Sequence, residues 1–323
     1  MSELYLSSGA RVPLMAGPGR KFKGTRLPGA TFQQAEQERY GVTIHTYTGT
    51  LFHLVLREFD CAKSQNFILR ESSPWLRLET VITGELRLSA QRMKEIHLHP
   101  GEYWLTDMPA CQLSFRSGGH CLCLSFFLSP ELLRQAPLGH TIVSAGPRLM
   151  SRPMRESVNR MLTNPFAQQL RDACYDYSIR ELLFYHISAP AELPPGELTQ
   201  EEISLMYAVD AIISANLNVH HTISELAQQV GTNDKVIKTH FVKVFGMSTF
   251  ERLIFLKMQT AQYLLETTDL QVQEVGEKSG YETPTGFINA FRDHFQVSPQ
   301  VWREQSRGLP PAQEENPAEG MSA

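Results

Sequence analysis

A repeat of about 50 residues near the C-terminal end of the chain constrains its fold most strongly. The repeated pairs are Ala227-x3-Gly231 with Gly276-x3-Gly280, and Phe241-x3-Phe245 with Phe291-x3-Phe295. A small residue four positions before a glycine lets two helices cross closely, and the glycine reaches the positive φ that a tight turn needs. Phenylalanines four positions apart lie on one face of a helix. The repeat therefore predicts two helix-turn-helix units.

Helix-capping residues place the boundaries of these units. N-terminal caps are predicted at Thr222 with Glu225, Ser248 with Glu251, Thr283-Pro284 and Ser298-Pro299. The second cap opens a helix predicted over 249–266, which would be about 27 Å long at 1.5 Å per residue. Two hairpins stacked as a repeat scaffold would explain the caps and the phenylalanines. They would not explain a small-x3-Gly turn on both sides of one long helix.

The rest of the chain divides into regions of different pattern. Between residues 42 and 127, apolar and polar residues alternate between turn signals about 8–12 residues apart, which is typical of a small antiparallel barrel or sandwich. Gly118-Gly119 is expected to form a hairpin. Helical spacing follows over 151–163 and 166–188. These two helices could pack on the barrel or pair with a second copy of the chain.

The sequence therefore predicts an α+β chain. Residues 1–188 are expected to form a β-rich, cupin-like barrel with a helical pair, and residues 201–307 an all-α domain with two helix-turn-helix units. The segment 189–200 contains three prolines and a glycine and is predicted to be a linker. The tail 308–323 is rich in Pro, Glu and Ala and is predicted to be disordered.

Composition argues against a membrane or secreted protein. Hydrophobic residues make up 42% of the 323, but apolar runs such as Leu122–Leu128 are far shorter than the roughly 18 residues of a membrane span. The N-terminal residues contain no apolar block followed by a cleavage site. Five cysteines without paired zinc spacing fit a reducing compartment. We therefore expect a cytoplasmic protein.

The charge distribution does not by itself indicate a nucleic-acid partner. The net charge is −4, and residues 201–307 carry nine Lys and Arg against 13 Asp and Glu. Residues 232–245, with three lysines and one aspartate, are locally basic. A strongly basic surface is the usual compositional sign of nucleic-acid binding, so any such role must be argued from local architecture.

Four groups of residues in the C-terminal third form a specific set. They are Gly246-Met247-Ser248, Ala261-Gln262-Tyr263-Leu264-Leu265, Gly280-Tyr281 and Phe291-x3-Phe295-x2-Ser298-Pro299. Over about 105 residues this set resembles the signature of the DNA-binding domain of the AraC/XylS family of bacterial transcription regulators. The resemblance implies seven helices, two helix-turn-helix units in successive major grooves, and activation or repression of transcription. The β-rich region resembles that family's effector-binding and dimerisation half less closely.

The second helix of each unit carries the candidate base-reading residues, because its exposed N-terminal side faces base edges. Lys235 and Lys238 could donate to guanine, Asn233 could pair with adenine, and Lys243 and the amides after Thr222 would meet phosphates. The second unit is less polar, with Asn289 where the family usually has arginine. We therefore expect the first unit to supply more of the base contacts. The predicted DNA-binding residues are Asn233, Lys235, Lys238, Thr239, Lys243, Thr285, Ile288, Asn289 and Arg292.

A small barrel can also hold one small molecule. The candidate lining residues are Trp75, Arg77, Glu79, Tyr103, Trp104 and Arg116. In the alternative interpretation, the aromatic residues fill the core and the charged residues face solvent. No residue pattern selects a class of ligand.

Two other motifs suggest chemistry. His97-Leu98-His99-Pro100-Gly101-Glu102 resembles part of a cupin metal site, but its last three residues already suit a turn. Cys121 and Cys123 share a strand face and could sense redox state, but their apolar neighbours favour a buried strand. The sequence contains no phosphate loop, nucleophile elbow or supported carboxylate pair, so we expect no enzymatic activity, metal or cofactor.

The sequence thus predicts a DNA-binding transcription regulator, an activator that responds to a small molecule through its N-terminal domain. Its expected partners are double-stranded promoter DNA, RNA polymerase, an unidentified effector and a second copy of the chain. Control by a protein partner instead of a ligand is one alternative. A metal-binding cupin enzyme with a helical appendage is another.

Overall fold

The protein is represented by a computed structural model. It describes residues 2–16, 26–71, 75–90, 94–135, 143–144, 146–163, 168–188 and 198–306. They form two compact parts, Met1–Ala215 with His221–Arg252, and Asn216–His220 with the chain from Leu253. The linker predicted at 189–200 lies almost wholly outside the described residues, and the predicted tail 308–323 lies entirely outside them. These domain boundaries therefore stay predictions.

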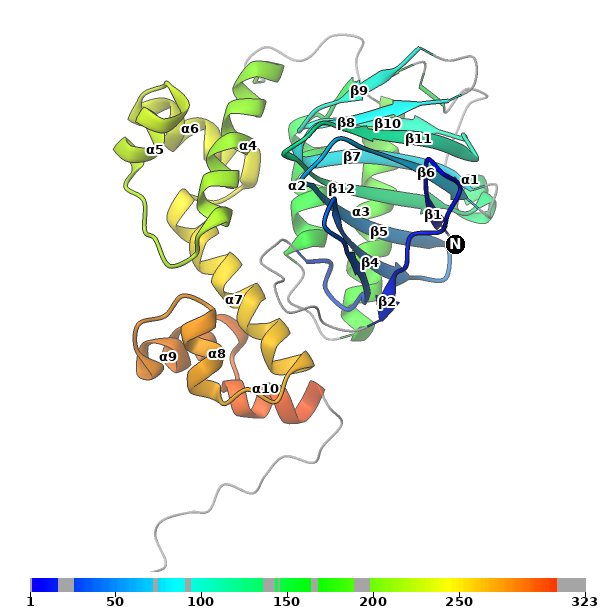
Figure 1. Ribbon diagram of the computed structural model, residues 1–323. Coiled ribbons are helices and arrows are strands. Elements are labelled where there is room, and N and C mark those ends of the chain that lie inside the picture. Colours follow the sequence, from blue (N-terminus) through cyan, green and yellow to red (C-terminus); the bar gives the residue numbers. More distant parts are fainter. Residues whose placement is uncertain are drawn as a thin grey trace, which may run out of the picture. The chain divides into compact units, whose positions relative to one another are not determined.

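The N-terminal region is β-rich, as predicted, and its described strands form two sheets (Figure 1). The five-stranded sheet has the order β1 (Ser2–Leu6), β6 (Gln65–Glu71), β11 (Ala110–Phe115), β8 (Leu86–Ser89), β9 (Ile96–Leu98). The eight-stranded sheet has the order β13 (Arg148–Leu149), β10 (Glu102–Thr106), β7 (Leu76–Gly84), β12 (Gly119–Leu128), β5 (Phe52–Cys61), β4 (Gly41–Thr48), β3 (Thr31–Glu36), β2 (Met15–Ala16). Neither sheet closes on itself among the described strands. The predicted barrel is therefore corrected to a pair of sheets.

The turn at Gly118 joins the two sheets. Gly118 has a φ of 72°, and the amide of Gly119 donates to the carbonyl of Arg116 over 3.0 Å, so the turn is as tight as predicted. The strands on its two sides do not pair with each other, however, because β11 pairs with β6 and β8 while β12 pairs with β5 and β7. The predicted hairpin is therefore wrong. Both edges of β12 are already occupied by long partners.

β12 is buried on both faces, since it lies between two layers. Cys121, Cys123 and Phe127 belong to a core that also contains Phe59 of β5 and Phe67 of β6, so this core lies between the two sheets. Side chains alternate along a strand, so the residues between them point to the opposite face of the sheet. This explains why β12 reads as a nearly continuous apolar run.

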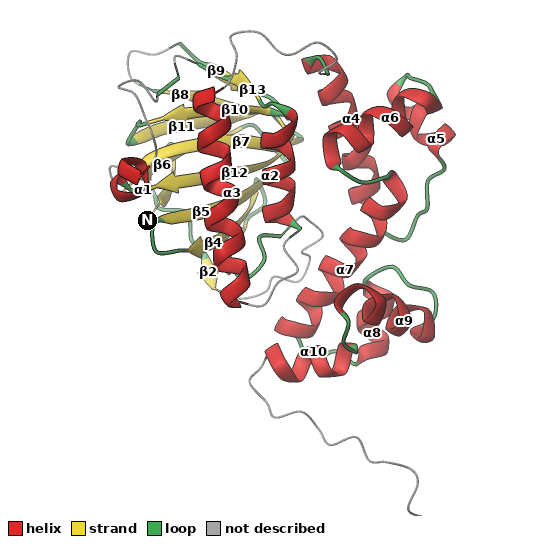
Figure 2. Ribbon diagram, turned by 180° about the vertical axis from the view of Figure 1, so that it is seen from behind, coloured by secondary structure: helices red, strands yellow, loops and turns green. Residues whose placement is uncertain are grey.

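Two helices cover that opposite face, where sequence spacing predicted helices (Figure 2). They are α2 (Arg152–Leu162) and α3 (Gln168–Ser188), which follow the short helix α1 (Pro130–Gln135). The hydroxyl of Tyr103 on β10 lies 2.9 Å from Nδ1 of His186 on α3, and the rings of Tyr47 and Tyr175 meet edge to face. One face of α3 is therefore fixed on the eight-stranded sheet.

Residues 200–306, all of which are described, form the seven predicted helices. They are α4 (Gln200–Ala215), α5 (Ile223–Val230), α6 (Asp234–Phe245), α7 (Thr249–Thr267), α8 (Val272–Lys278), α9 (Pro284–Phe295) and α10 (Pro299–Ser306). The expected caps are present, with reciprocal bonds between Thr222 and Glu225 and between Ser248 and Glu251. The α+β class is confirmed.

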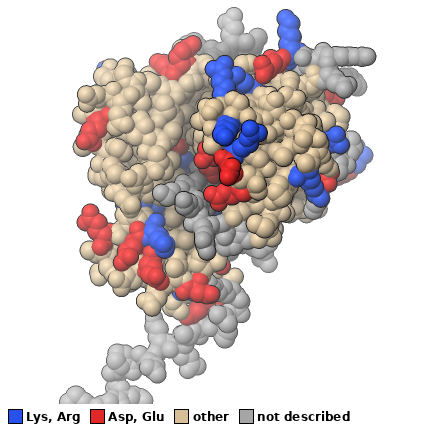
Figure 3. Space-filling model, in the orientation of Figure 1, with Lys and Arg blue, Asp and Glu red and all other residues tan. Residues whose placement is uncertain are grey.

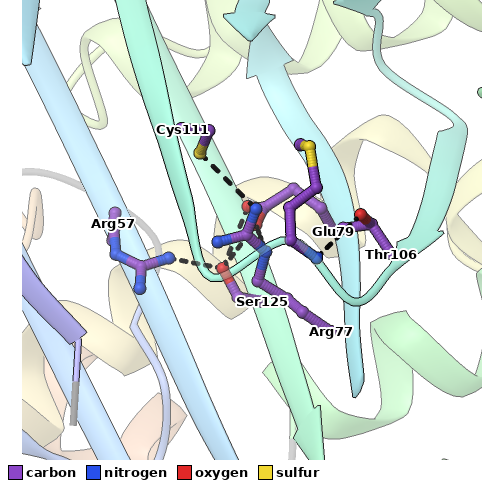
Figure 4. A network of polar contacts seen from close by, with 7 residues as sticks. Arg57, Arg77, Glu79, Thr106, Cys111 and Ser125 are labelled. Carbon is purple, nitrogen blue, oxygen red and sulfur yellow. Dashed lines mark hydrogen bonds and ion pairs between the residues drawn. The ribbon is translucent and has the colours of Figure 1, made fainter. Parts of the chain in front are cut away.

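A buried polar network lies between the two sheets (Figure 4). Arg57, Arg77 and Glu79 are each at most 2% exposed. Ser125 donates to the Glu79 carboxylate at 2.9 Å and accepts a hydrogen bond from Arg57. Arg77 Nε lies 3.4 Å from Glu79 Oε2, and Arg77 Nη2 lies 3.5 Å from the Cys111 sulfur. Removing one member of such a network leaves a buried charge without the opposite charge that stabilises it.

Glu79→Gln should therefore lower the free energy of unfolding by about 3–5 kcal/mol, because it removes the carboxylate charge next to buried guanidinium groups. Urea denaturation followed by intrinsic fluorescence would measure the change. Glu85→Gln is the matched control, because Glu85 pairs with Arg87 at a half-exposed position, and we expect a loss of at most about 1 kcal/mol. Equal losses in the two variants would contradict the assigned role of the network.

Candidate nucleic-acid interface

The first helix-turn-helix unit consists of α5 and α6 with Gly231 between them. Gly231 has a φ of 72°, which confirms the predicted left-handed conformation. The amide of Thr232 donates to the carbonyl of Ala227 over 2.9 Å, and Ala227 is buried. Ser224 Oγ also donates to Asp234 at 2.7 Å, which ties the first helix to the start of the second. The turn is thus fixed by backbone and side-chain bonds.

α6 has a buried face and an exposed face. Ile237, Phe241 and Phe245 are buried, as predicted. The opposite face exposes Lys235, Lys238 and Thr239, while Lys243 is half-buried. Lys235 and Lys238 are therefore exposed on the face that is predicted to read base edges.

Val242 lies on the same face, one turn after Lys238, and is 43% exposed. Sequence reasoning missed it, although its spacing from Lys235 and Lys238 places it on their face. An exposed apolar side chain beside cations suits contact with a thymine methyl group. The face therefore combines donors with an apolar contact.

Asn233 has a structural role that the prediction did not include. It is the N-cap of α6, and its side-chain oxygen accepts a hydrogen bond from the amide of Val236 over 3.1 Å. Bidentate recognition of adenine would use the same oxygen as its acceptor. The cap therefore competes with the predicted base contact. An Asn directly before a helix is itself a capping signal, so the sequence contained this information.

The start of α5 differs from the predicted phosphate site. The Glu225 amide donates to the Thr222 hydroxyl at 3.2 Å, and the Thr222 amide donates to the Glu225 carboxylate at 2.7 Å. These amides are already bonded, and a carboxylate at this position would repel a phosphate. The capping box therefore takes the place of the anion contact expected after Thr222.

The second unit consists of α8 and α9, and its two glycines are required by packing. Gly280 has a φ of 88°, as predicted for the turn. A Cβ atom added to Gly280 would lie 2.7 Å from the carbonyl oxygen of Leu217. A Cβ atom added to Gly276 would lie 3.0 Å from the side chain of Phe287. α8 and α9 therefore approach closely at Gly276, and Gly280 lies against the segment that follows α4.

The exposed face of α9 offers fewer donors than that of α6. Thr285, Asn289 and Arg292 are exposed and Ile288 is half-buried. Arg292 Nη2 donates to the Asn289 side-chain oxygen over 3.1 Å, so these two side chains bind each other. Gly286 lies on this face as well and adds no side chain to it. In Figure 3, acidic side chains predominate on the visible face of the part of the chain that contains α8, α9 and α10.

Lys257 is a further residue that sequence reasoning missed. Its Nζ donates to the carbonyl of Gly280 at 2.6 Å and lies 5.0 Å from the centroid of the Tyr281 ring. Burial lowers the pKa of Lys257. This side chain fixes the turn of the second unit from α7. Its apolar neighbours in the sequence gave no sign of that role.

The structure separates the six residues predicted to line an effector pocket. Arg77, Glu79 and Trp104 point into the layer between the sheets (Figure 4 shows the first two). Tyr103 is adjacent to Trp104 on β10 and therefore points to the other face, toward α3. The prediction that both aromatic residues line one pocket is thus corrected.

The remaining two candidates lie at the margins of this layer. Trp75 packs against the core and stacks on His53, with the ring centroids 4.4 Å apart. Arg116 is exposed in the turn after β11 and does not join the other candidates. Sequence alternation could not place Arg116 because it lies outside a strand.

The motifs that suggested a metal site and a redox-sensitive pair of thiols have other roles in the described part of the chain. No group of three or more His, Cys, Asp or Glu side chains in this part of the chain is arranged to hold a metal ion. His97 Nδ1 lies 2.7 Å from Glu85, and Glu102 accepts from the amide of His99 across the turn. Cys121 and Cys123 are at most 1% exposed. Hydrogen bonding to Cys121 and burial raise the pKa of the Cys123 thiol.

Comparisons with known proteins agree with this geometry. Residues 226–305 match a family described as "Helix-turn-helix domain". The transcriptional activator RhaR of Enterobacter sp. is 27% identical over 107 residues, which are 33% of this chain and 38% of RhaR. The lactose operon transcription activator of Staphylococcus xylosus is 29% identical over 107 residues, 33% of this chain and 37% of that protein. The C-terminal domain of the chain is of the AraC type.

Among solved structures, the AraC-type domain is similar to the C-terminal domain of the response regulator yesN from Fusobacterium nucleatum. The two are 28% identical, and the match covers 30% of this chain and 95% of that chain, with a TM-score of 0.28. The chain spans just over a third of the length of the curated relatives named above. No helix in the described part of the chain is long and apolar enough to cross a membrane.

The two turn glycines of the AraC-type domain should respond differently to substitution. The Cβ atom added by Gly231→Ala would have no atom within 4 Å. The substitution should therefore lower the free energy of unfolding only by the roughly 1–2 kcal/mol that alanine costs in a left-handed conformation. Gly280→Ala adds a clash with the Leu217 carbonyl and should cost more. Native-state hydrogen exchange of the amides in α5–α6 and in α8–α9 would measure both losses. The opposite order would contradict this packing.

The predicted base-reading faces of α6 and α9 should also differ. Lys238→Ala should weaken specific DNA binding by about 1–3 kcal/mol, the value of a good base contact. Asn289→Ala should cost less, because Asn289 is engaged by Arg292. Gel-shift titrations of both variants on one operator would give the order. A larger loss of DNA affinity for Asn289→Ala would mean that the second unit, and not the first, makes most of the base contacts.

Proposed function

We propose that the protein regulates transcription by binding promoter DNA through both helix-turn-helix units, with the first unit making most base contacts. The exposed face of α6 carries this proposal. Lys235 and Lys238 project from a helix whose opposite side is buried on Ile237, Phe241 and Phe245. A fixed helix with exposed donors is what major-groove recognition needs.

The proposed mode of action is activation, with RNA polymerase as the second macromolecular partner. RhaR and the lactose operon protein are both named as activators, which supports this choice. The net negative charge of residues 201–307 points the same way. With few phosphate contacts, affinity should depend only modestly on salt, and contacts to a protein partner would help to hold the regulator on its site.

We further propose that the N-terminal domain senses a small molecule in the cytoplasm. The support is the group formed by Arg57, Arg77 and Glu79 between the sheets. Charged groups in an apolar core are costly, and hydrophobic residues would hold two sheets together as well. A ligand-induced rise in melting temperature, reduced in Arg77→Met, would support a site in this layer. Control by a protein partner would instead appear as a co-purifying protein without any ligand-induced shift.

Footprinting tests the use of two units. The full chain should protect two segments of DNA about one helical turn, roughly 34 Å, apart because each unit is expected to enter one major groove. The fragment 197–307 should protect the same pair more weakly. Protection confined to one segment by both proteins would show that a single unit engages DNA, and the two-unit proposal would then fail.

A further inference from the structure

α6 and α9 present their outward side chains in the same register. Both helices have 12 residues, and the numbers of equivalent positions differ by 50. Phe241 of α6 and its equivalent Phe291 of α9 are buried. Ile237 and its equivalent Phe287 are buried as well. Because the inward sides match, residues whose numbers differ by 50 occupy equivalent places on the outward sides.

Four positions on the outward side of each helix have the spacing i, i+3, i+4 and i+7. A recognition helix that lies along the major groove reaches bases from positions with this spacing. The positions are Lys235, Lys238, Thr239 and Val242 in α6, and Thr285, Ile288, Asn289 and Arg292 in α9. Val242 therefore belongs to the same set as the two lysines of α6.

The second and fourth of these positions carry opposite chemical types in the two helices. α6 has a cation, Lys238, followed one turn later by an apolar side chain, Val242. α9 has an apolar side chain, Ile288, followed one turn later by a cation, Arg292. None of the four side chains is buried, so all of them reach the surface. The order of cation and apolar group is thus reversed between the two units.

We propose that this reversal makes the two units recognise different base pairs. A half-site is here the segment of DNA that one unit reads. Lys238 reads a guanine and Val242 a thymine in the first half-site, whereas Ile288 reads a thymine and Arg292 a guanine in the second. The inference rests on the proposed function, that both units bind DNA, and adds the sequence pattern that each unit recognises.

The chemistry of the major groove supports these pairs. Lysine and arginine donate to the O6 and N7 acceptors of guanine, and an apolar side chain contacts the methyl group of thymine. Residues one turn apart lie about 6 Å apart along a helix, at 1.5 Å per residue. Neighbouring base pairs lie roughly 3.4 Å apart along the DNA axis. The guanine and the thymine of one half-site are therefore separated by about two base-pair steps.

The exposure of Val242 favours a role in binding over a role in folding. Its side chain is 43% exposed, whereas Phe241 and Phe245 fill the core behind it. A β-branched side chain also lowers helix propensity slightly, so valine at an exposed helix position adds little to stability. An apolar contact supplied by the DNA gives this side chain a use.

In α9, Asn289 holds the arginine on the outward side. Arg292 Nη2 donates to the Asn289 side-chain oxygen over 3.1 Å, and both residues are exposed. A guanidinium has five N–H donors in a rigid fork, and this bond uses one of them. The other donors suit the two acceptors of guanine.

Selection of bound duplexes from a pool of random sequence, with the full chain and with single alanine variants, assigns base pairs to side chains. Val242→Ala and Ile288→Ala should each relax the preference for one T·A pair. Lys238→Ala and Arg292→Ala should each relax the preference for one G·C pair. If the unmodified chain enriches no sequence, the proposed function fails. Enrichment whose T·A preference is unchanged in Val242→Ala would overturn this inference alone.

Exchange of thymine for uracil removes only the methyl group and isolates the apolar contact. Uracil is placed at each thymine of the enriched first half-site in turn, and affinity is measured by gel-shift titration. At one position it should weaken binding of the unmodified chain about 4-fold, the effect of losing the burial of one methyl-sized group. This loss should vanish in Val242→Ala.

Val219→Ala is the matched control for this measurement. Val219 is similarly exposed, at 39%, but lies before α5 and outside α6 and α9. The variant should keep the full difference between thymine and uracil. Equal binding of all uracil duplexes by the unmodified chain would overturn the methyl contact.

The double variant Lys238→Ile/Val242→Arg gives α6 the order of α9. Both positions are exposed, so the buried side of α6 is unchanged. Selection with this variant should exchange the G·C and T·A pairs of the first half-site and leave the second half-site as it was. An unchanged second half-site also shows that the domain is folded. A first half-site that keeps its original order would overturn the proposal.

Discussion

α6 and α9 each owe their orientation to the aromatic rings that they bury. In α6 the rings of Phe241 and Phe245 lie 4.5 Å apart, and in α9 those of Phe287 and Phe291 lie 5.7 Å apart. Neither helix can rotate about its axis without exposing these rings, and burial of a phenylalanine contributes about 1.5–3 kcal/mol. The direction of every outward side chain follows from this anchoring. The tight glycine turns serve the same end, because they bring the preceding helix close enough to cover the rings.

The parts of the fold that depend on local chemistry were predictable, and the parts that depend on distant pairing were not. Caps such as Thr222 and turns such as Gly231 have their causes within a few residues, so the boundaries of the two helix-turn-helix units could be placed from sequence, whereas the number of seven helices followed from the family resemblance. The partners of β12 are far away in the chain, and nothing near Gly118 shows that its two strands enter different sheets. The candidate site divides in the same way. The exposed lysines of α6 follow from helical periodicity, whereas the contact of Lys257 with Gly280 needs the tertiary fold.

The N-terminal region is organised around β12, which belongs to both of its layers. Ser125 joins the charged network between the sheets, while Phe126, the next residue, points toward the helical layer. The strand therefore carries part of the charged network on one face and part of the surface under the helical layer on the other.

The two helix-turn-helix units end differently. α6 ends at Gly246 with a φ of 72°, whereas α9 ends at Gln296 with a φ of 63°, the only described non-glycine residue with positive φ. A side chain in this conformation costs roughly 1–2 kcal/mol, of which the bond from the Gln296 amide group to the Asp293 carbonyl returns a part. The end of α9 is therefore where this domain should open first in the native state. A protease that samples locally open chains would cut there before it cut the first unit, so the lifetime of the protein would depend on a residue outside the predicted DNA-binding set.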